Sequence, residues 1–316
     1  MLPKEEKMKI NLLFPGQGSQ FEGMGLDFYK KYNLYQNIID EAGLVSGMDL
    51  CSILGDAGRL NETENAQIAI FTMSYGIASL LSAEGIEVSN VLGLSLGEYG
   101  ALTHSGVLKR TDTVKLLKRR SSLMQMAAKE REGFLAAVSF MDREEVLKAI
   151  SGLEGVSISN CNAPNQNVVG GDLAMKEEFD RRIREQGGKK ITYLNVSGAF
   201  HTPLMEKAGI LFGEHLSHFS FSLPSIPVLS NLKGDYYQEG DHVPTLLTEH
   251  IFRPVQLDSC IGRLEAREED IHIVLGPGKA LASILKQNKT EGKVITISDV
   301  EEFENAVKLL KERQNG

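Results

Sequence analysis

The chain of 316 residues has few cysteines and no excess of positive charge, and each shortage excludes a class of protein. Cys51, Cys161 and Cys260 stand far apart without any Cys-x-x-Cys or Cys/His pattern, so we expect reduced cytosolic thiols and no zinc site. The net charge of −8 argues against general nucleic-acid binding. With 42% hydrophobic and 24% charged residues, the composition is that of a soluble globular protein.

Long hydrophobic runs are also scarce. The first ten residues, MLPKEEKMKI, carry charge and lack the apolar stretch of a signal peptide, which predicts a cytoplasmic protein. The longest uncharged run, residues 66–83, is long enough to cross a membrane. It contains polar side chains, among them Gln67, Thr72 and Ser74. That content favours a buried helix, with a membrane span as the weaker alternative.

Short apolar segments alternate with helical patterns along most of the chain. Strands are expected at 9–14, 88–93, 227–230 and 272–275. Helices are expected at 66–84, 96–105, 111–129, from about 280, and after a capping box formed by Ser298 and Glu301. Strands that alternate with helices imply a mostly parallel sheet covered by helices.

The pattern changes near Gly133. The order of elements becomes β-α-β-β-α-β, with strands at 134–140, 156–160, 167–169 and 190–196 and helices at 142–150 and 176–186. This order is the ferredoxin-like arrangement. We therefore predict a small ferredoxin-like subdomain, residues 131–200, inserted into the larger domain.

The sharpest local feature is Gly-Leu-Ser-Leu-Gly-Glu at 93–98, between a predicted strand and a predicted helix. A nucleophile elbow requires that context: the glycines permit a tight turn that projects Ser95, and the helix start supplies N–H groups for an oxyanion. The alternative is an ordinary Gly/Ser turn. The elbow predicts an α/β-hydrolase-like catalytic domain formed by residues 1–130 and 201–316.

A serine nucleophile needs a base. Among the seven histidines, His201 stands at the end of a predicted strand, in SGAFHTPLM, where the subdomain returns to the larger domain. It is either that base or a packing histidine, and His104, on the helix after the elbow, competes with it. His215 and His218 lie in a helical stretch, and no context supports His242, His250 and His272.

Two further segments can take part in chemistry. The glycine-rich loop FPGQGSQ at 14–20 lacks the third glycine of a dinucleotide fingerprint and the Gly-Lys-Ser/Thr of a Walker loop. It is either a plain turn or a loop that aims a backbone N–H at a neighbouring site. Arg120, on an otherwise apolar helix, can hold a carboxylate by two parallel hydrogen bonds. A solvated basic face with Lys118 and Arg119 is the alternative.

Five features in this order resemble one family: FPGQGSQ at 14–20, GLSLGEYGAL at 93–102, Arg120, AFHTPLM at 199–205 and GPGKAL at 276–281. Together they closely resemble malonyl-CoA:acyl-carrier-protein transacylases and the acyltransferase domains of polyketide synthases. The match runs from about residue 9 to 290. The resemblance implies that a malonyl group moves from malonyl-CoA to acyl carrier protein through a malonyl-serine, for fatty acid biosynthesis. It implies no bound cofactor, no metal, and neither nucleic acid nor membrane as a partner.

The resemblance also implies residue roles. Ser95 matches the nucleophile, His201 its base, and Arg120, rather than Arg119, the group that binds the malonyl carboxylate. The backbone N–H groups of Gln17 and Leu96 match the oxyanion hole. Gln67 matches a glutamine of the site, and Asn160 and Asn162 match a loop that lines the cleft. Phe200, beside His201, resembles the malonyl-preferring version of that motif. Because carrier proteins are generally acidic, exposed lysines are candidates for docking, with scattered solvated lysines as the alternative: Lys189, Lys190, Lys279, Lys286 and Lys289.

Two positions depart from the family pattern. Leu94 stands where the family usually has histidine, which we expect to alter the edge of the pocket and not the chemistry. The resemblance also implies that a backbone carbonyl orients the histidine. The matching segment is residues 252–255, and we assign the carbonyl to Arg253, where the family often has asparagine or serine. Three other functions remain: a trans-acting polyketide acyltransferase, a serine thioester hydrolase, and a non-catalytic carrier-binding protein.

Overall fold

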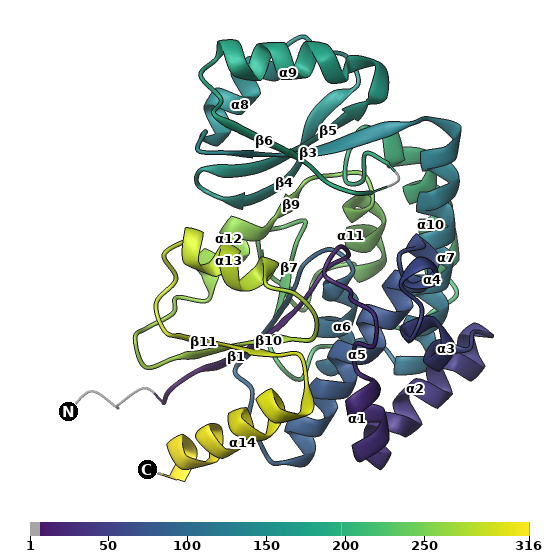
Figure 1. Cartoon of the computed structure of the whole chain (residues 1–316), viewed down its shortest axis with the longest axis vertical. Helices are drawn as coiled ribbons and strands as arrows, with labels where there is room; N and C mark the ends of the chain where they lie inside the picture. The colour runs from purple at the N-terminus through teal and green to yellow at the C-terminus, as the bar shows by residue number, and fades with distance from the viewer. Residues whose placement is uncertain (1–6, 197, 316) are drawn as a thin grey trace.

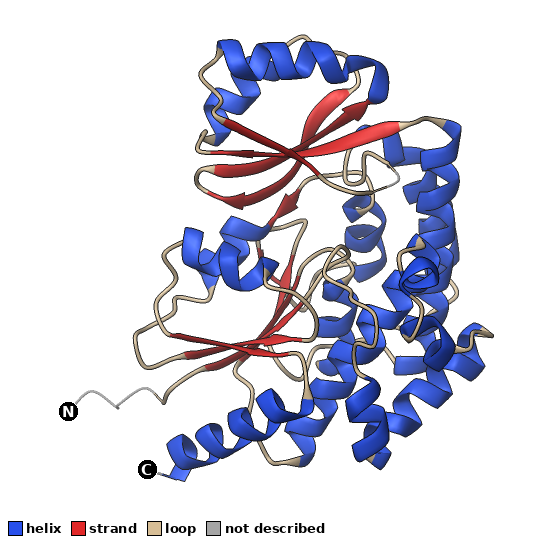
Figure 2. Cartoon of the chain, in the orientation of Figure 1, coloured by secondary structure: helices blue, strands red, loops and turns tan. Residues whose placement is uncertain are grey.

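The computed structural model describes residues 7–196 and 198–315, and it has a mixed α/β fold with two sheets (Figure 1). Most of the charged N-terminal segment, for which the sequence predicts no signal peptide, lies outside the described residues. Ser197, the first residue of SGAFHTPLM, also lies outside them. Figure 2 shows that helices cover both sheets, and most of them gather along one side of the larger sheet.

The larger sheet has six strands in the order β11-β10-β1-β2-β7-β8. Their bounds are β1 Ile10–Phe14, β2 Asn90–Gly93, β7 Val228–Ser230, β8 Asp235–Tyr236, β10 Ile271–Leu275 and β11 Lys293–Ile297. All neighbours pair in parallel except β8, which is antiparallel to β7. The four predicted strands are present, and the two edge strands β8 and β11 were not predicted.

Both faces of this sheet are buried, as the apolar sequence of β1 requires. Leu12 and Phe14 point into one core, which they share with the long helices, while Leu13 points into a second core with α12 and α13. The helices are α1 Leu26–Lys31, α2 Asn33–Ser46, α3 Leu50–Leu54, α4 Ala57–Leu60, α5 Thr63–Ala83, α6 Gly97–His104, α7 Arg110–Glu130, α8 Arg143–Ile150, α9 Lys176–Glu185, α10 Glu206–Leu216, α11 Val243–His250, α12 Leu257–Arg263, α13 Ala280–Gln287 and α14 Val300–Asn315.

Helix α5 contains the long uncharged run. Within the described residues it is the one helix long and apolar enough to cross a membrane, but most of it is buried inside the protein. Two of its buried hydroxyl groups are satisfied within the helix: Thr72 and Ser74 each donate to a backbone carbonyl one turn earlier. The run is therefore a core helix, as its polar content predicted.

The smaller sheet has the order β6-β3-β5-β4-β9. Its strands are β3 Gly133–Ser139, β4 Val156–Ala163, β5 Gln166–Asp172, β6 Lys190–Tyr193 and β9 Val255–Gln256. The first four pair antiparallel, and β9 joins in parallel with β4. Strand β9 comes from a later part of the chain than the predicted insertion, and two residues are too few to show a periodic pattern.

The two faces of the smaller sheet have different neighbours. In β3, Phe134, Ala136 and Val138 pack on the core beneath α8 and α9, whereas Leu135 and Ala137 pack on the core of the larger sheet. This is the period of two expected for a strand. Figure 1 accordingly shows α8 and α9 on the outer side of this sheet.

The two predicted helix caps differ in outcome. Asp142 and Glu145 form the capping box at the start of α8, one of the features the sequence predicted. The box predicted at Ser298 and Glu301 is wrong. Asp299 instead accepts from the N–H of Glu302 (2.8 Å), and the Glu302 carboxylate reaches back to the N–H of Ser298. The aspartate one position later supplies the acceptor, and its negative charge suits the positive end of the helix dipole.

Candidate active site

Ser95 stands on a strained turn between β2 and α6. Its φ of 54° lies in the left-handed region, where a non-glycine residue is rare and often functional. A Cβ on Gly93 would lie 1.9 Å from the Gly97 carbonyl carbon, and one on Gly97 would lie 2.1 Å from the Phe14 carbonyl oxygen. Both glycines are therefore required by contact, which an ordinary Gly/Ser turn does not demand.

His201 is placed to accept the serine proton. Its Nε2 lies 2.7 Å from Ser95 Oγ, and its Nδ1 lies 2.6 Å from the backbone oxygen of His250. Because a carbonyl only accepts, Nδ1 carries the proton and Nε2 is free to accept from the hydroxyl. Burial, helped by the charge of Arg120, lowers the pKa of His201 to about 3. The imidazole is therefore neutral and available as a base at pH 7.

The orienting carbonyl belongs to His250, and the assignment to Arg253 is wrong. His250 ends α11, and its carbonyl is turned toward the histidine. Arg253 is exposed, with its guanidinium on Glu249. A backbone carbonyl is present at every residue, so the side chains of this segment could not indicate which one is used.

Arg120 reaches Ser95 from α7. Its side chain is buried, 1% exposed, whereas Arg119 is exposed. Its Nη1 donates to Gln67 Oε1 (2.8 Å) and its Nη2 donates to Ser95 Oγ (3.0 Å). The guanidinium lies 5.5 Å from the centre of the Tyr99 ring. A buried cation held beside the Ser95 hydroxyl is an arrangement that suits an anionic substrate group.

These residues share one pocket of about 480 Å³ between the two sheets. Ser95, His201, Arg120, Gln17, Leu96, Gln67, Asn160, Asn162 and Phe200 all line it, as does Leu94. Asn160 and Asn162 lie on β4, where irregular pairing with β5 interrupts the ladder. His104 does not line this pocket. The centre of its ring lies 6.1 Å from that of the Phe14 ring, and burial lowers the pKa of His104 to about 4.

Two backbone N–H groups beside Ser95 remain available. Within the parts of the chain that the structure describes, the N–H groups of Gln17 and Leu96 have no hydrogen-bond acceptor. Leu96 is also the N-cap of α6, where the positive end of the helix dipole lies. Both groups are thus suited to stabilise negative charge that develops on a substrate oxygen.

The five candidate docking lysines are all exposed. Lys286 lies on α13, and Lys279 directly precedes this helix, whose residues Leu281, Ile284 and Gln287 line the pocket. Lys190 begins β6, an edge strand of the smaller sheet, and Lys189 directly precedes it. The first pair is therefore next to the pocket.

Sequence reasoning missed Asn231, which holds the elbow. Its Oδ1 accepts from the N–H of Ser95 (2.7 Å) and its Nδ2 donates to the carbonyl of Gly93 (2.6 Å). One side chain therefore ties together both sides of the strained turn. Asn231 directly follows β7, and a polar residue at the carboxyl end of a parallel strand was a usable signal.

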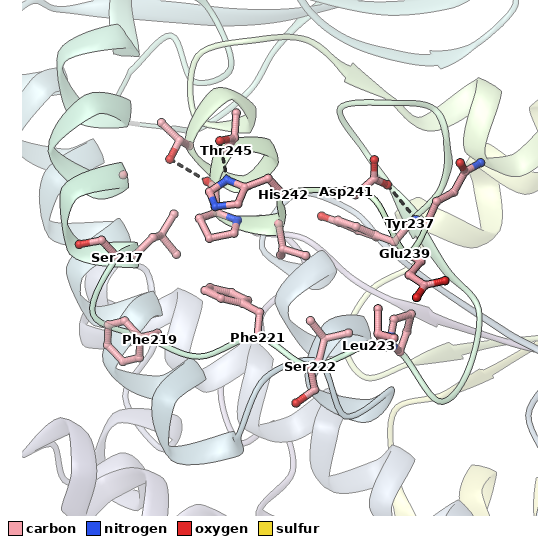
Figure 3. Close-up of a pocket in the computed structure, with 18 residues that line it drawn as sticks. Ser217, Phe219, Phe221, Ser222, Leu223, Tyr237, Glu239, Asp241, His242 and Thr245 are labelled. Carbon is pink, nitrogen blue, oxygen red and sulfur yellow. Dashed lines mark hydrogen bonds between the residues drawn. The ribbon is translucent and has the colours of Figure 1, made fainter.

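A second pocket, of about 730 Å³, lies apart from this chemistry (Figure 3). Phe219, Phe221 and His242 line it, and neither Ser95 nor His201 does. Tyr237 is in its wall, and the Tyr237 hydroxyl donates to Glu98. Among the described residues, no group of histidine, cysteine and acidic side chains could hold a metal ion, and all three cysteines are free.

Known proteins resemble this chain in both sequence and fold. The acyl transferase domain family matches residues 12–313. A malonyl CoA-acyl carrier protein transacylase of Bacillus subtilis is 35% identical over 313 residues, which is 97% of this chain and 99% of that protein. The crystal structure of such a transacylase from Clostridium perfringens is 33% identical, with a TM-score of 0.91 over 97% of this chain and 98% of that one.

A third similar protein was solved with a partner. It is the malonyl-transacylase in a complex with a type II polyketide synthase acyl-carrier protein, 26% identical with a TM-score of 0.89, over 95% of this chain and 99% of that one. The family match and the first two relatives extend over nearly the whole chain, and the features that carry the sequence resemblance meet in one pocket. The chain therefore belongs to the malonyl CoA-acyl carrier protein transacylases of the acyl transferase domain family.

Proposed function

We propose that this chain transfers a malonyl group from malonyl-CoA to the phosphopantetheine thiol of acyl carrier protein, in the cytoplasm, and so supplies fatty acid biosynthesis. The observation that carries the proposal is the meeting of Ser95 Oγ, His201 Nε2 and the Arg120 guanidinium within hydrogen-bond distance in one pocket. The names of the similar proteins support the choice of acyl donor and acceptor.

The first half-reaction makes a malonyl-serine. Ser95 Oγ attacks the thioester carbonyl while His201 Nε2 takes the hydroxyl proton. The N–H groups of Gln17 and Leu96 stabilise the oxyanion of the tetrahedral intermediate, an effect worth about 3 kcal/mol per donor. The intermediate then breaks its carbon–sulfur bond, and the proton on His201 passes to the departing CoA thiolate. The serine ester and free CoA are the products.

The second half-reaction runs the same steps in the opposite sense. The phosphopantetheine thiol enters the place that CoA left, His201 takes its proton, and the sulfur attacks the ester carbonyl. The ester oxygen of Ser95 leaves and recovers the proton from His201. Because one site serves both thiols in turn, ping-pong kinetics are expected.

Arg120 is the proposed determinant of substrate choice. Its two Nη atoms, now on Gln67 and Ser95, can present two parallel donors to the malonyl carboxylate. An acetyl group would leave this buried cation without an anionic partner, which is unfavourable. The supporting roles proposed for Asn160, Asn162 and Phe200 are to line the path of the acyl group and the pantetheine arm.

We further propose that the fold consists of an α/β-hydrolase-like domain, residues 1–130 and 201–316, and an inserted ferredoxin-like subdomain, residues 131–200. The strand order β6-β3-β5-β4 and its antiparallel pairing support the second part. The elbow after β2 of a parallel sheet supports the first. For docking of an acidic carrier we propose Lys279 and Lys286, because they lie beside the pocket.

One observation favours a second carrier. The similarity to a malonyl-transacylase in complex with a type II polyketide synthase carrier makes such a carrier the alternative acceptor, with unchanged chemistry. Two observations argue against a serine hydrolase: the histidine is oriented by a carbonyl and not by an acid, and Arg120 is placed on the nucleophile.

Intact-mass measurement after brief exposure to malonyl-CoA tests the proposal. We expect the mass of one malonyl group to be added to the wild type, to be absent in Ser95→Ala, and to disappear when acyl carrier protein is added. Free CoA that accumulates without a mass gain and without a carrier would indicate hydrolysis. If the mass does not increase and no CoA is released, transacylation by malonyl-CoA is refuted.

A further inference from the structure

A buried carboxyl lies directly behind the catalytic pair. Glu98, in the first turn of α6, is 1% exposed. Its Oε1 accepts from the Tyr237 hydroxyl (2.6 Å) and from the backbone N–H of Asn231 (3.3 Å), and its Oε2 lies 3.1 Å from His250 Nδ1. One side chain thus contacts three segments: the residue after β7, the residue after β8 and the end of α11.

Two of these three residues touch the reacting groups from their other side. Asn231 gives its backbone N–H to Glu98 and its side chain to Ser95 and Gly93. His250 places its ring at Glu98 and its carbonyl at His201 Nδ1. The rings of His250 and His201 also stack, 4.9 Å apart and 26° from parallel. Glu98 is therefore one residue away from both the nucleophile and the base.

The burial of this carboxyl is unfavourable for its charged form. Burial raises the pKa of Glu98 to about 7, against the hydrogen bonds from Tyr237 and Asn231, which lower it. Within the described residues, Glu98 Oε2 and both ring nitrogens of His250 have no hydrogen-bond partner. A buried polar group that is only partly satisfied costs stability, whereas the bonds from Tyr237 and Asn231 fix the position of Oε1. Stability alone is thus a poor explanation for an acid at this position.

We propose that Glu98 is a positioning residue for the transfer reaction: by holding Asn231, Tyr237 and His250 together, it sets the alignment of Ser95 Oγ with His201 Nε2. The inference rests on the proposed function, because it concerns acylation of the same serine. Glu98 does not line the substrate pocket. Its loss should therefore slow the chemical step and leave the binding of malonyl-CoA unchanged.

The expected size follows from the geometry. A displacement of about 1 Å between reacting groups can slow a reaction roughly 10²-fold. Glu98→Ala removes all three contacts, so we expect acylation of Ser95 to slow by about that factor with an unchanged KM for malonyl-CoA. Glu98→Gln should restore most of the rate: its amide oxygen still accepts from Tyr237 and Asn231, and its NH₂ group can donate to His250.

The experiment is single-turnover acylation by malonyl-CoA, quenched at short times and read by intact mass, with circular dichroism on each variant. Slow acylation in Glu98→Ala, an unchanged KM and rescue by Glu98→Gln would support the positioning role. An acylation rate equal to that of the wild type in Glu98→Ala would overturn it. A raised KM with an unchanged rate constant would also overturn it.

A second pair of variants decides the matter if Glu98→Ala fails to fold. Tyr237→Phe removes only the hydroxyl that bonds to Glu98, and Tyr237 enters this network from the wall of the pocket in Figure 3. Its control is Tyr236→Phe, because the Tyr236 hydroxyl bonds instead to Asn90 and to the carbonyl of Arg263. We expect slower acylation in Tyr237→Phe alone, and equal rates in both would overturn the inference.

The same experiment separates the two proposals. If malonyl-CoA does not acylate the wild type, the proposed function fails, and the positioning role fails with it. If the wild type is acylated and both Glu98→Ala and Tyr237→Phe react at its rate, the positioning role alone is refuted.

Discussion

Arg120→Ala should convert a malonyl transferase into one with little preference for malonyl over acetyl groups. In the wild type the guanidinium is buried and its Nη atoms point to Gln67 and Ser95. Each charge-assisted hydrogen bond to a carboxylate contributes about 1.5–3 kcal/mol, so two parallel bonds contribute roughly 3–6 kcal/mol. At 1.4 kcal/mol per factor of ten, kcat/KM for malonyl-CoA should fall by roughly 10²- to 10⁴-fold.

Acetyl transfer should respond differently. An acetyl group makes no bond to the guanidinium. Removing the guanidinium therefore takes away a buried cation without an anionic partner, and no contact with the acetyl group is lost. The positive charge of Arg120 also contributes to the low pKa of His201, so the variant's base should accept a proton more readily. We expect acetyl transfer to persist and the ratio of malonyl to acetyl kcat/KM to collapse.

The assay measures kcat/KM for both acyl-CoA donors with the same carrier protein. Arg119→Ala is the matched control, because Arg119 is the preceding residue of the same helix and is exposed. The reasoning is refuted if the malonyl-to-acetyl ratio is unchanged in Arg120→Ala, or if it falls equally in Arg119→Ala.

Three further predictions concern stability. Gly97→Ala should strongly lower the denaturation midpoint or prevent folding, because its Cβ would lie 2.1 Å from the Phe14 carbonyl oxygen; a midpoint like that of the wild type would contradict this contact. Asp142→Ala should cost about 1 kcal/mol of unfolding free energy through loss of the α8 cap, with unchanged transfer kinetics. The pKa of His201 is about 3 in the folded protein and 6.5 normally. Between these values the unfolded chain binds a proton at His201 and the folded protein does not, so the contribution of His201 to stability is lost as pH falls from about 6.5 toward 3. Urea titrations of the wild type and His201→Gln should therefore converge or cross in that range, and a parallel pH dependence would contradict the assignment.

The long elements could be predicted because their patterns extend over several turns. Helices α5 and α7 were expected at 66–84 and 111–129 and are found within a few residues of those limits. The two-residue strands β8 and β9 have no periodicity to detect, since their partners in the sheet define them. Strand β11 has exposed Lys293 and Val294 at its start, so its sequence does not resemble that of the buried strands.

The site was predictable where side chains are the functional groups. Ser95 and Arg120 drew attention because a hydroxyl between two glycines and a cation on an apolar face are unusual. His250 could not be found in this way, because its carbonyl acts and its ring is hidden behind His201. Glu98 was visible in the motif, but an acid in the first turn of a helix is common enough to pass as a favourable partner of the helix dipole.

Pairing between β4 and β9 links the two parts of the pocket. Asn160 pairs with Val255 and Cys161 with Gln256, so the strand that carries the pocket-lining Asn160 is hydrogen-bonded to the segment that follows α11. That helix ends at His250, whose carbonyl oxygen lies 2.6 Å from Nδ1 of His201. The N–H of Gln256 also donates to the carbonyl of Asn231, the residue that holds the elbow. A rotation of the smaller sheet would therefore reach the residues that contact Ser95 and His201, because β9 is hydrogen-bonded both to β4 and to Asn231. The chain connections near residues 131 and 200 alone would not couple the two sheets in this way.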